Sequence, residues 1–144
     1  MSLLNSAVTI GLMGEYLAAA AIISIGTHKV SLCQQTAVDL VAFDADSYLS
    51  VQVKTSTLHQ RPHRQPSYQF QLAHGSKVKR KHSARDFDIY ALVAGDPSHR
   101  RCLFLPTAKL CLQSTKRLSP SRFTAEAEVE SWHKAVDYVL EMRR

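Results

Sequence analysis

The sequence predicts an α/β domain in which a mixed central sheet is flanked by helices. Three observations support this prediction: apolar residues recur at helical spacing over residues 5–25, apolar and polar residues alternate over Tyr48–Lys54, and an apolar side returns at helical spacing near the C-terminus. The chain has 144 residues, a length expected for one compact domain. We therefore treat residues 1–144 as a single domain.

The first predicted helix covers residues 5–25. Asn5 or Ser6 can cap its start, and Gly26 fits just past its end. The run Ala18–Ala21 has little side-chain bulk, which allows the helix to pack close to a sheet. The residues that recur at helical spacing are Val8, Leu12, Tyr16, Ala19 and Ile23.

Strands are expected after this helix. A short one is predicted over Lys29–Cys33, and a central one over Ala37–Phe43, which is apolar on both faces apart from Asp39. Residues 44–47 form a turn, and Tyr48–Lys54 alternates as the next strand. The strands Ala37–Phe43 and Tyr48–Lys54 should form an antiparallel hairpin, and the first helix should pack against one face of their sheet.

The middle of the chain is polar and irregular apart from one predicted strand. Thr55–Pro66 reads as a loop, and Tyr68–Leu72 alternates as a strand. Residues 73–85 are basic and contain a glycine, so we expect a long loop there.

A final hairpin and helix complete the prediction. Phe87–Ala94 and Arg101–Leu105 are the hairpin strands, and residues 108–113 predict a short helix. The C-terminal helix starts at Ser121 or Thr124.

The charge is strongly segregated along the chain. The net charge is +6 and the pI about 9.4, but residues 1–50 hold four acids against one base, Lys29. Residues 59–85 hold seven bases and no acid. Such a block suits the phosphate backbone of nucleic acid, although a solvated basic face or a nuclear-localisation patch has the same composition. The seven bases are Arg61, Arg64, Lys77, Lys79, Arg80, Lys81 and Arg85.

Four polar residues are candidates for phosphodiester chemistry. Gln52 and Lys54 are two apart on a strand, so their side chains share a face, and one hairpin joins them to Asp39. A carboxylate within a strand needs a partner, which a metal ion can supply. Mg²⁺ prefers oxygen ligands and few protein carboxylates. Asp39, the Gln52 amide and the Val53 carbonyl could supply these, and Glu15 could bind a second ion or hold water.

The residues resemble the PD-(D/E)xK nuclease superfamily, in particular a small branch with Gln-x-Lys that includes homing endonucleases of bacterial group I introns and lies near Holliday-junction resolvases. The resemblance implies a restriction-endonuclease-like αβββαβ core, with Glu15, Asp39 and Gln52 in the metal site and Lys54 as the catalytic lysine. It also implies Mg²⁺, with Mn²⁺ as a substitute. The matching segments are Gly14–Ala20, Val38–Val41, Val51–Thr55, Asp86–Val93 and Phe104–Pro106.

The sequence departs from the superfamily pattern at two positions. Val38 stands where a proline often precedes the aspartate, a position that varies. Gln52 replaces an acid and removes one negative charge from the metal site. The domain is therefore either an active member of the Gln-containing branch or a nuclease fold that has lost activity; we expect activity because Glu15, Asp39 and Lys54 all remain.

These observations predict a Mg²⁺-dependent DNA endonuclease that hydrolyses phosphodiester bonds in double-stranded DNA, homing- or restriction-like. The alternatives are a Holliday-junction resolvase with the same site and a non-catalytic nucleic-acid-binding protein on a nuclease fold. Cutting both strands calls for two active sites, so we expect a homo-dimer or homo-tetramer. The N-terminal segment has no base before Lys29, and no run of 18 apolar residues occurs, which predicts a cytoplasmic protein without a membrane partner.

Overall fold

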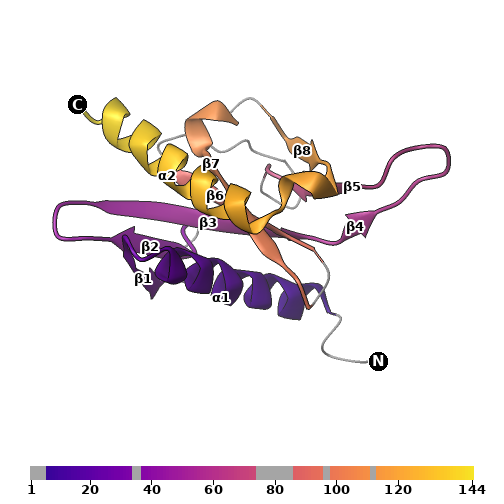
Figure 1. Ribbon diagram of the computed structural model, residues 1–144, viewed down its shortest axis with the longest axis horizontal. Helices are drawn as coiled ribbons and strands as arrows, with labels where there is room; N and C mark the ends of the chain where they lie inside the picture. The colour runs from indigo at the N-terminus through magenta and orange to yellow at the C-terminus, as the bar shows by residue number, and fades with distance from the viewer. Residues whose placement is uncertain (1–5, 34–36, 74–85, 96–97, 111–112) are drawn as a thin grey trace.

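A computed structural model describes residues 6–33, 37–73, 86–95, 98–110 and 113–144 of the chain. Two sheets and two long helices make up the described part (Figure 1). The larger sheet has five strands in the order β1-β2-β3-β6-β7, and the smaller has three in the order β4-β5-β8. The α/β class predicted from the sequence is confirmed.

The five-stranded sheet is mixed because one of its pairings is parallel. Neighbouring strands pair antiparallel except β3 and β6, which run parallel with Val51 opposite Ile89. The predicted hairpins, β2 with β3 and β6 with β7, are both present. The strands are β1 (Lys29–Leu32), β2 (Leu40–Phe43), β3 (Tyr48–Ser56), β6 (Ile89–Ala94) and β7 (Arg101–Pro106).

Strands β4 (Leu58–His59), β5 (Ser67–Gln71) and β8 (Thr115–Leu118) form the second sheet. The strand predicted at Tyr68–Leu72 is therefore present as β5, but it does not join the central sheet. The described part of the crossover from β3 to β6 thus contains two strands joined by a turn. The residue pattern predicts loops and one strand there, and the αβββαβ core implied by the resemblance has a helix, which is not seen in the described part; residues 74–85 lie outside it.

The region after β7 differs from the sequence prediction in two ways. The short helix expected over residues 108–113 is only a single turn of 3₁₀ helix, η2 (Thr107–Lys109). Strand β8 was not predicted, because Leu118 is its only apolar residue and leaves no alternation to detect. A second 3₁₀ turn, η3 (Pro120–Arg122), leads into the last helix.

The two faces of the central sheet are covered differently. Helices α1 (Ala7–Ile25) and α2 (Ala125–Met142) pack on one face, where Trp132 is fully buried and its ring meets Phe104 edge-on at 5.0 Å. The small sheet covers part of the other face through a separate apolar cluster that includes Phe70 and Leu92. The domain is thus layered helix, sheet, sheet.

Helix α1 buries its small residues and exposes its large ones. Ser6 caps its start by accepting a hydrogen bond from the Thr9 amide, and Gly26 ends it at a φ of 91°, as expected for a left-handed C-terminal residue. The buried residues of α1 are Gly14, Ala18, Ala19, Ala21 and Ile22.

The large apolar residues of α1 that recur at helical spacing do not face the sheet. Val8 is 83% exposed and Tyr16 is 56% exposed. The pattern identifies the helix but not its inner side, because apolar residues surround the helix. By length and hydropathy alone, α1 also satisfies the requirements for a membrane-spanning helix, although it contains no run of 18 apolar residues.

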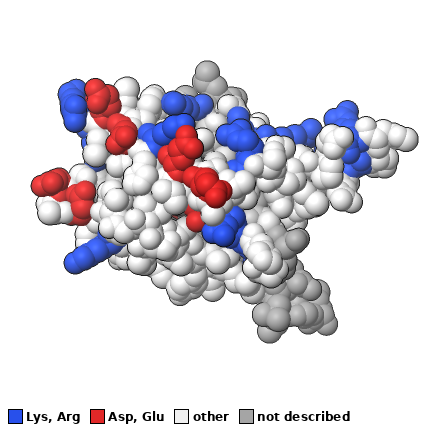
Figure 2. Space-filling model, viewed as in Figure 1, with Lys and Arg blue, Asp and Glu red and all other residues white. Residues whose placement is uncertain are grey.

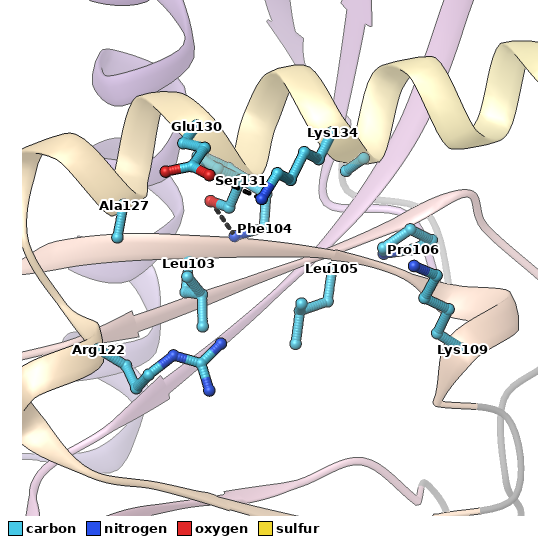
Figure 3. A pocket seen from close by; sticks show the side chains of 11 residues that line it. Leu103, Phe104, Leu105, Pro106, Lys109, Arg122, Ala127, Glu130, Ser131 and Lys134 are labelled. Atoms are coloured by element: carbon cyan, nitrogen blue, oxygen red, sulfur yellow. Dashed lines mark hydrogen bonds and ion pairs between the residues drawn. The ribbon is translucent and has the colours of Figure 1, made fainter.

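Helix α2 runs along the outer edge of β7 and binds two of its main-chain amides, of which that of Phe104 is drawn in Figure 3. The Cys102 amide donates to Glu128 Oε1 at 2.9 Å, and the Phe104 amide donates to Ser131 Oγ at 3.0 Å. Such unpaired amides would otherwise be open to another strand. The edge of the sheet at β7 is therefore closed by side chains of a helix.

Candidate active site

The candidate site lies where β2 is shorter than β3. The register of this pair runs from Phe43 opposite Tyr48 to Leu40 opposite Val51, so β3 extends beyond it by the segment 52–56. This segment pairs with β6 on one side. Its other edge borders a cavity of about 480 Å³, which is also lined by residues of α1. The chain thus leaves main-chain groups of β3 open to a polar site.

Asp39 does not sit inside a strand, contrary to the sequence prediction. Strand β2 begins at Leu40, and Asp39 lies just before it. Its main chain still follows the sheet, since its amide donates to the Val51 carbonyl at 2.9 Å. Its carboxylate takes the place of a missing strand neighbour, because the Val53 amide donates to Asp39 Oδ2 at 2.8 Å. This bond fixes the carboxylate against β3.

Gln52, Lys54 and Thr55 line the same cavity as Asp39. Gln52 is only 8% exposed, and its Oε1 atom has no hydrogen-bond partner among the described residues. Thr55 Oγ1 is likewise buried without a hydrogen-bond partner. A buried polar atom without a partner costs about 1–3 kcal/mol, so such atoms call for an explanation. Thr55 was not predicted, because nothing in the sequence distinguishes this threonine from its neighbours.

Glu15 reaches the cavity from α1 because the helix lies very close to β3. Gly14 makes this approach possible: a Cβ atom at this position would overlap Thr55 Oγ1. Glu15 is half-buried, and its carboxyl group lies close enough to that of Asp39 for the two to interact electrostatically. All four predicted site residues, Glu15, Asp39, Gln52 and Lys54, therefore line one cavity, together with Val53.

The two carboxyl groups perturb each other. Burial raises the pKa of Glu15, and the negative charge of the nearby Asp39 raises it further. Burial also raises the pKa of Asp39, although the Val53 amide, Glu15 and the Lys54 charge partly oppose this. Both carboxyls are thus harder to ionise in the folded protein than in water, a cost that a bound cation would remove.

Comparisons with known proteins identify the architecture. No protein-family model and no curated protein sequence matches the chain. A solved structure of a bacterial homing endonuclease, I-Ssp6803I, superimposes with a TM-score of 0.71 over 97% of this chain and 99% of that chain, at 17% sequence identity. The two chains share one fold. The expected nuclease fold is confirmed, and assignment to the Gln-x-Lys branch stays a prediction.

On this nuclease fold, the cavity fits a small divalent cation by the chemistry of its donors. Among the described residues, no three His, Cys, Asp or Glu side chains lie close enough to hold an ion together. The site instead offers two carboxylates, Asp39 and Glu15, and the unpartnered amide oxygen of Gln52. Mg²⁺ commonly takes one or two protein carboxylates and keeps several waters, so this sparse set suits it.

Only two members of the predicted basic block can be placed. Arg61 and Arg64 lie in the turn between β4 and β5, both exposed, on a hairpin that projects from the body (Figure 1). In the view of Figure 2 this projection carries blue side chains and no red ones. The members outside the described residues are Lys77, Lys79, Arg80, Lys81 and Arg85.

A second hollow, of about 320 Å³, lies between β7 and α2 and differs in character (Figure 3). Its charged groups, apart from Arg122, have partners within the fold. Lys134 Nζ lies 2.6 Å from Glu130 Oε1, and Lys109 Nζ lies 4.9 Å from the centre of the Tyr138 ring. Because Glu130, the acidic residue of its lining, is already paired and no buried unpartnered atom of the described residues lies there, we do not assign this hollow a catalytic role.

Proposed function

We propose that the chain is a Mg²⁺-dependent endonuclease that hydrolyses phosphodiester bonds of double-stranded DNA. The observation that carries this proposal is Gln52 Oε1, a buried oxygen without a hydrogen-bond partner, in a cavity lined by Asp39, Glu15 and Lys54. The structural likeness to a homing endonuclease supports the same conclusion at the level of the fold.

Each residue has a distinct role in this proposal. Asp39 and Gln52 hold the cation, and the Val53 carbonyl is available to join them because it points to the same strand edge as the Val53 amide, which Asp39 binds. Glu15 orients water or holds a second ion. When bound, Mg²⁺ acts as a Lewis acid on the phosphate that is attacked. The Lys54 ammonium stabilises the negative charge that develops on the phosphate during attack by water.

Incubation of long linear duplex DNA of diverse sequence with the protein, with and without Mg²⁺, tests the proposal. We expect fragments in Mg²⁺ or Mn²⁺ and none in a chelator. Asp39→Asn should slow cleavage by roughly 10²–10³-fold or more, since it removes a charge on which the chemistry depends. The matched control is Asp46→Asn, an exposed aspartate in the turn between β2 and β3, which should cut at the normal rate.

The same assay separates the alternatives. Preferential cleavage of a four-way junction over linear duplex would identify a resolvase. DNA binding without Mg²⁺-dependent cutting of any substrate would overturn the proposal in favour of a non-catalytic nucleic-acid-binding protein.

We further propose that the enzyme acts in the cytoplasm as a homo-dimer or homo-tetramer, with a second copy covering the outer face of α1. That face exposes Val8, Leu12, Tyr16 and Ile23, an apolar stripe of the kind that marks interfaces. Leu12→Glu should then lower the mass measured by sedimentation, whereas Val129→Glu, at an exposed valine of α2, should leave it unchanged. A monomeric wild type, or recovery of the wild type in the membrane fraction, would contradict this proposal.

A further inference from the structure

The small sheet β4-β5-β8 is built from two acid-free segments of the chain. Residues 47–85 contain no Asp or Glu, and neither do residues 97–125, which carry six bases. The first segment supplies β4 and β5, and the second supplies β8. A sheet assembled from both has no acidic side chain of its own to repel a phosphate backbone.

The two faces of this sheet have opposite character. Tyr68, Phe70 and Leu118 are buried against the central sheet. The outer face carries Gln69 directly opposite Arg117, because these two residues are partners in the β5–β8 register. Arg117 is exposed and Gln69 half-buried. The next pair on the same face is Gln71 opposite Thr115.

The outer face is also hollowed around this central pair. A small cavity of about 100 Å³ is lined by Arg61, Arg64, Gln65, Ser67, Gln69 and Arg117. Within the described residues, the Gln69 and Arg117 side chains make no hydrogen bond or ion pair. An arginine and a glutamine held side by side on a sheet, each with its donors unused, can bind a ligand at little cost in side-chain ordering.

The outer face is coupled directly to the candidate active site. Ser56 lies two residues beyond Lys54 on β3, and its Oγ accepts a hydrogen bond from the Gln69 amide at 3.2 Å. Thr57, next along the chain, lines the active-site cavity. A strand that holds the proposed catalytic lysine therefore positions the strand that carries Gln69.

We propose that the outer face of β5 and β8 enters the major groove of duplex DNA, where Gln69 and Arg117 hydrogen-bond base edges. This inference rests on the proposed function and names its specificity-determining residues. Arginine matches guanine O6 and N7, and glutamine matches adenine N6 and N7. Directly opposite residues of an antiparallel pair have Cβ atoms about 4.5–5.5 Å apart, so the Gln69 and Arg117 side chains can reach neighbouring base pairs, which are about 3.4 Å apart along the helix axis. Arg61 and Arg64, on the exposed turn, contact phosphates instead.

Cleavage of a randomised duplex library, followed by sequencing of the cut ends, tests this inference. Wild type should show preferred bases. Gln69→Ala should lose an adenine preference, and cleavage of the preferred duplex should fall roughly 10–100-fold. Arg117→Gln should move a guanine preference toward adenine at a base pair near the first, a change that loss of charge alone does not produce. The control, Lys29→Ala on exposed β1, should keep the wild-type profile.

The outcomes separate this inference from the proposed function. The wild type could cut with base preferences that both variants retain, or it could cut without any preference. Either result would show that the outer face of β5 and β8 does not read base edges, while the endonuclease proposal would stand. If wild type cuts no duplex, the proposed function fails. Sequences recovered by binding from the same library then decide the inference alone, with the same variants and the same criteria. Thermal melting confirms that the variants, altered on an exposed face, remain folded.

Discussion

Two buried polar clusters in this domain differ in how completely their atoms are bonded. At the edge of β7, Glu128 and Ser131 each accept a main-chain amide, and Arg101 lies 3.6 Å from Glu128. In the cavity beside β3, Gln52 Oε1 and Thr55 Oγ1 have no hydrogen-bond partner among the described residues. The hydrogen bonds of the first cluster stabilise the fold. The unpartnered oxygens of the second cluster lower the stability of the fold but remain available to bind a ligand. Other buried atoms of the described residues also lack partners, such as Thr107 Oγ1, but only in this cavity do two such oxygens line the same space as two carboxyl groups.

The largest expected contrast is catalytic. Lys54→Met should reduce the rate of Mg²⁺-dependent cleavage by about 10²–10³-fold, because it removes the charge proposed to stabilise the transition state. Thermal stability should change little. Lys29→Met, at an exposed lysine of β1, should leave both the rate and the melting temperature unchanged. Equal rates for the two variants would remove Lys54 from the mechanism.

The β7 cluster should show the reverse behaviour. Glu128→Ala leaves the buried Cys102 amide without its partner, so the free energy of unfolding should fall by about 1–3 kcal/mol. Cleavage per folded molecule should persist. Urea unfolding measures the loss, with Glu126→Ala as the comparison, since Glu126 is exposed on the same helix and should cost only about 0.3–1 kcal/mol. A large drop in cleavage by folded Glu128→Ala would erase the distinction between the clusters.

Two glycines of α1 test how closely this helix approaches β3 at the candidate active site. Gly14→Ala should destabilise the protein by about 1–3 kcal/mol and slow cleavage, because the new Cβ pushes the helix and Glu15 away from Thr55. Gly11→Ala has open space and should stabilise the helix by about 0.5–1 kcal/mol. Chemical denaturation of both variants checks the signs. Equal stability would contradict the close approach of α1 to β3.

The smallest expected effect concerns the carboxyl pair. Because the pKa of Glu15 is raised on folding, its ionisation opposes folding above the folded-state pKa and has no effect below the unfolded-state pKa. Glu15→Gln should therefore raise the melting temperature of the metal-free protein at neutral pH, and the gain should vanish as the solution is acidified. Added Mn²⁺ should stabilise wild type more than this variant. A lower melting temperature for Glu15→Gln at neutral pH would show that the carboxylate is structural.

Much of the fold could be predicted because its long elements carry strong local signals. Ser6 and Gly26 mark the ends of α1, and the turn at Asp44 marks the hairpin of β2 and β3. The inner side of α1 could not be predicted, since an all-round apolar helix has no polar face to exclude. The second sheet was missed because β4 and β8 are two and four residues long and are held by pairing with β5.

The candidate site was predictable in part for a similar reason. The two-residue spacing of Gln52 and Lys54 places them on one face, and the hairpin brings Asp39 beside them. That Asp39 substitutes for a strand neighbour depends on where β2 stops, which no local pattern encodes. Arg117 was missed although residues 97–125 form a second acid-free segment, a signal that was available in the sequence.

The closed edge of β7 has a consequence for self-assembly in misfolded states. A sheet grows into fibrils by adding strands to an open edge, and β7 offers no such template while Glu128 and Ser131 occupy its amides. The opposite edge of the five-stranded sheet is β1, four residues long and beginning with a lysine, features that disfavour strand addition. Within the described central sheet, resistance to aggregation therefore depends on a helix staying in place, so that partial unfolding of α2 is the step that exposes the chain to polymerisation.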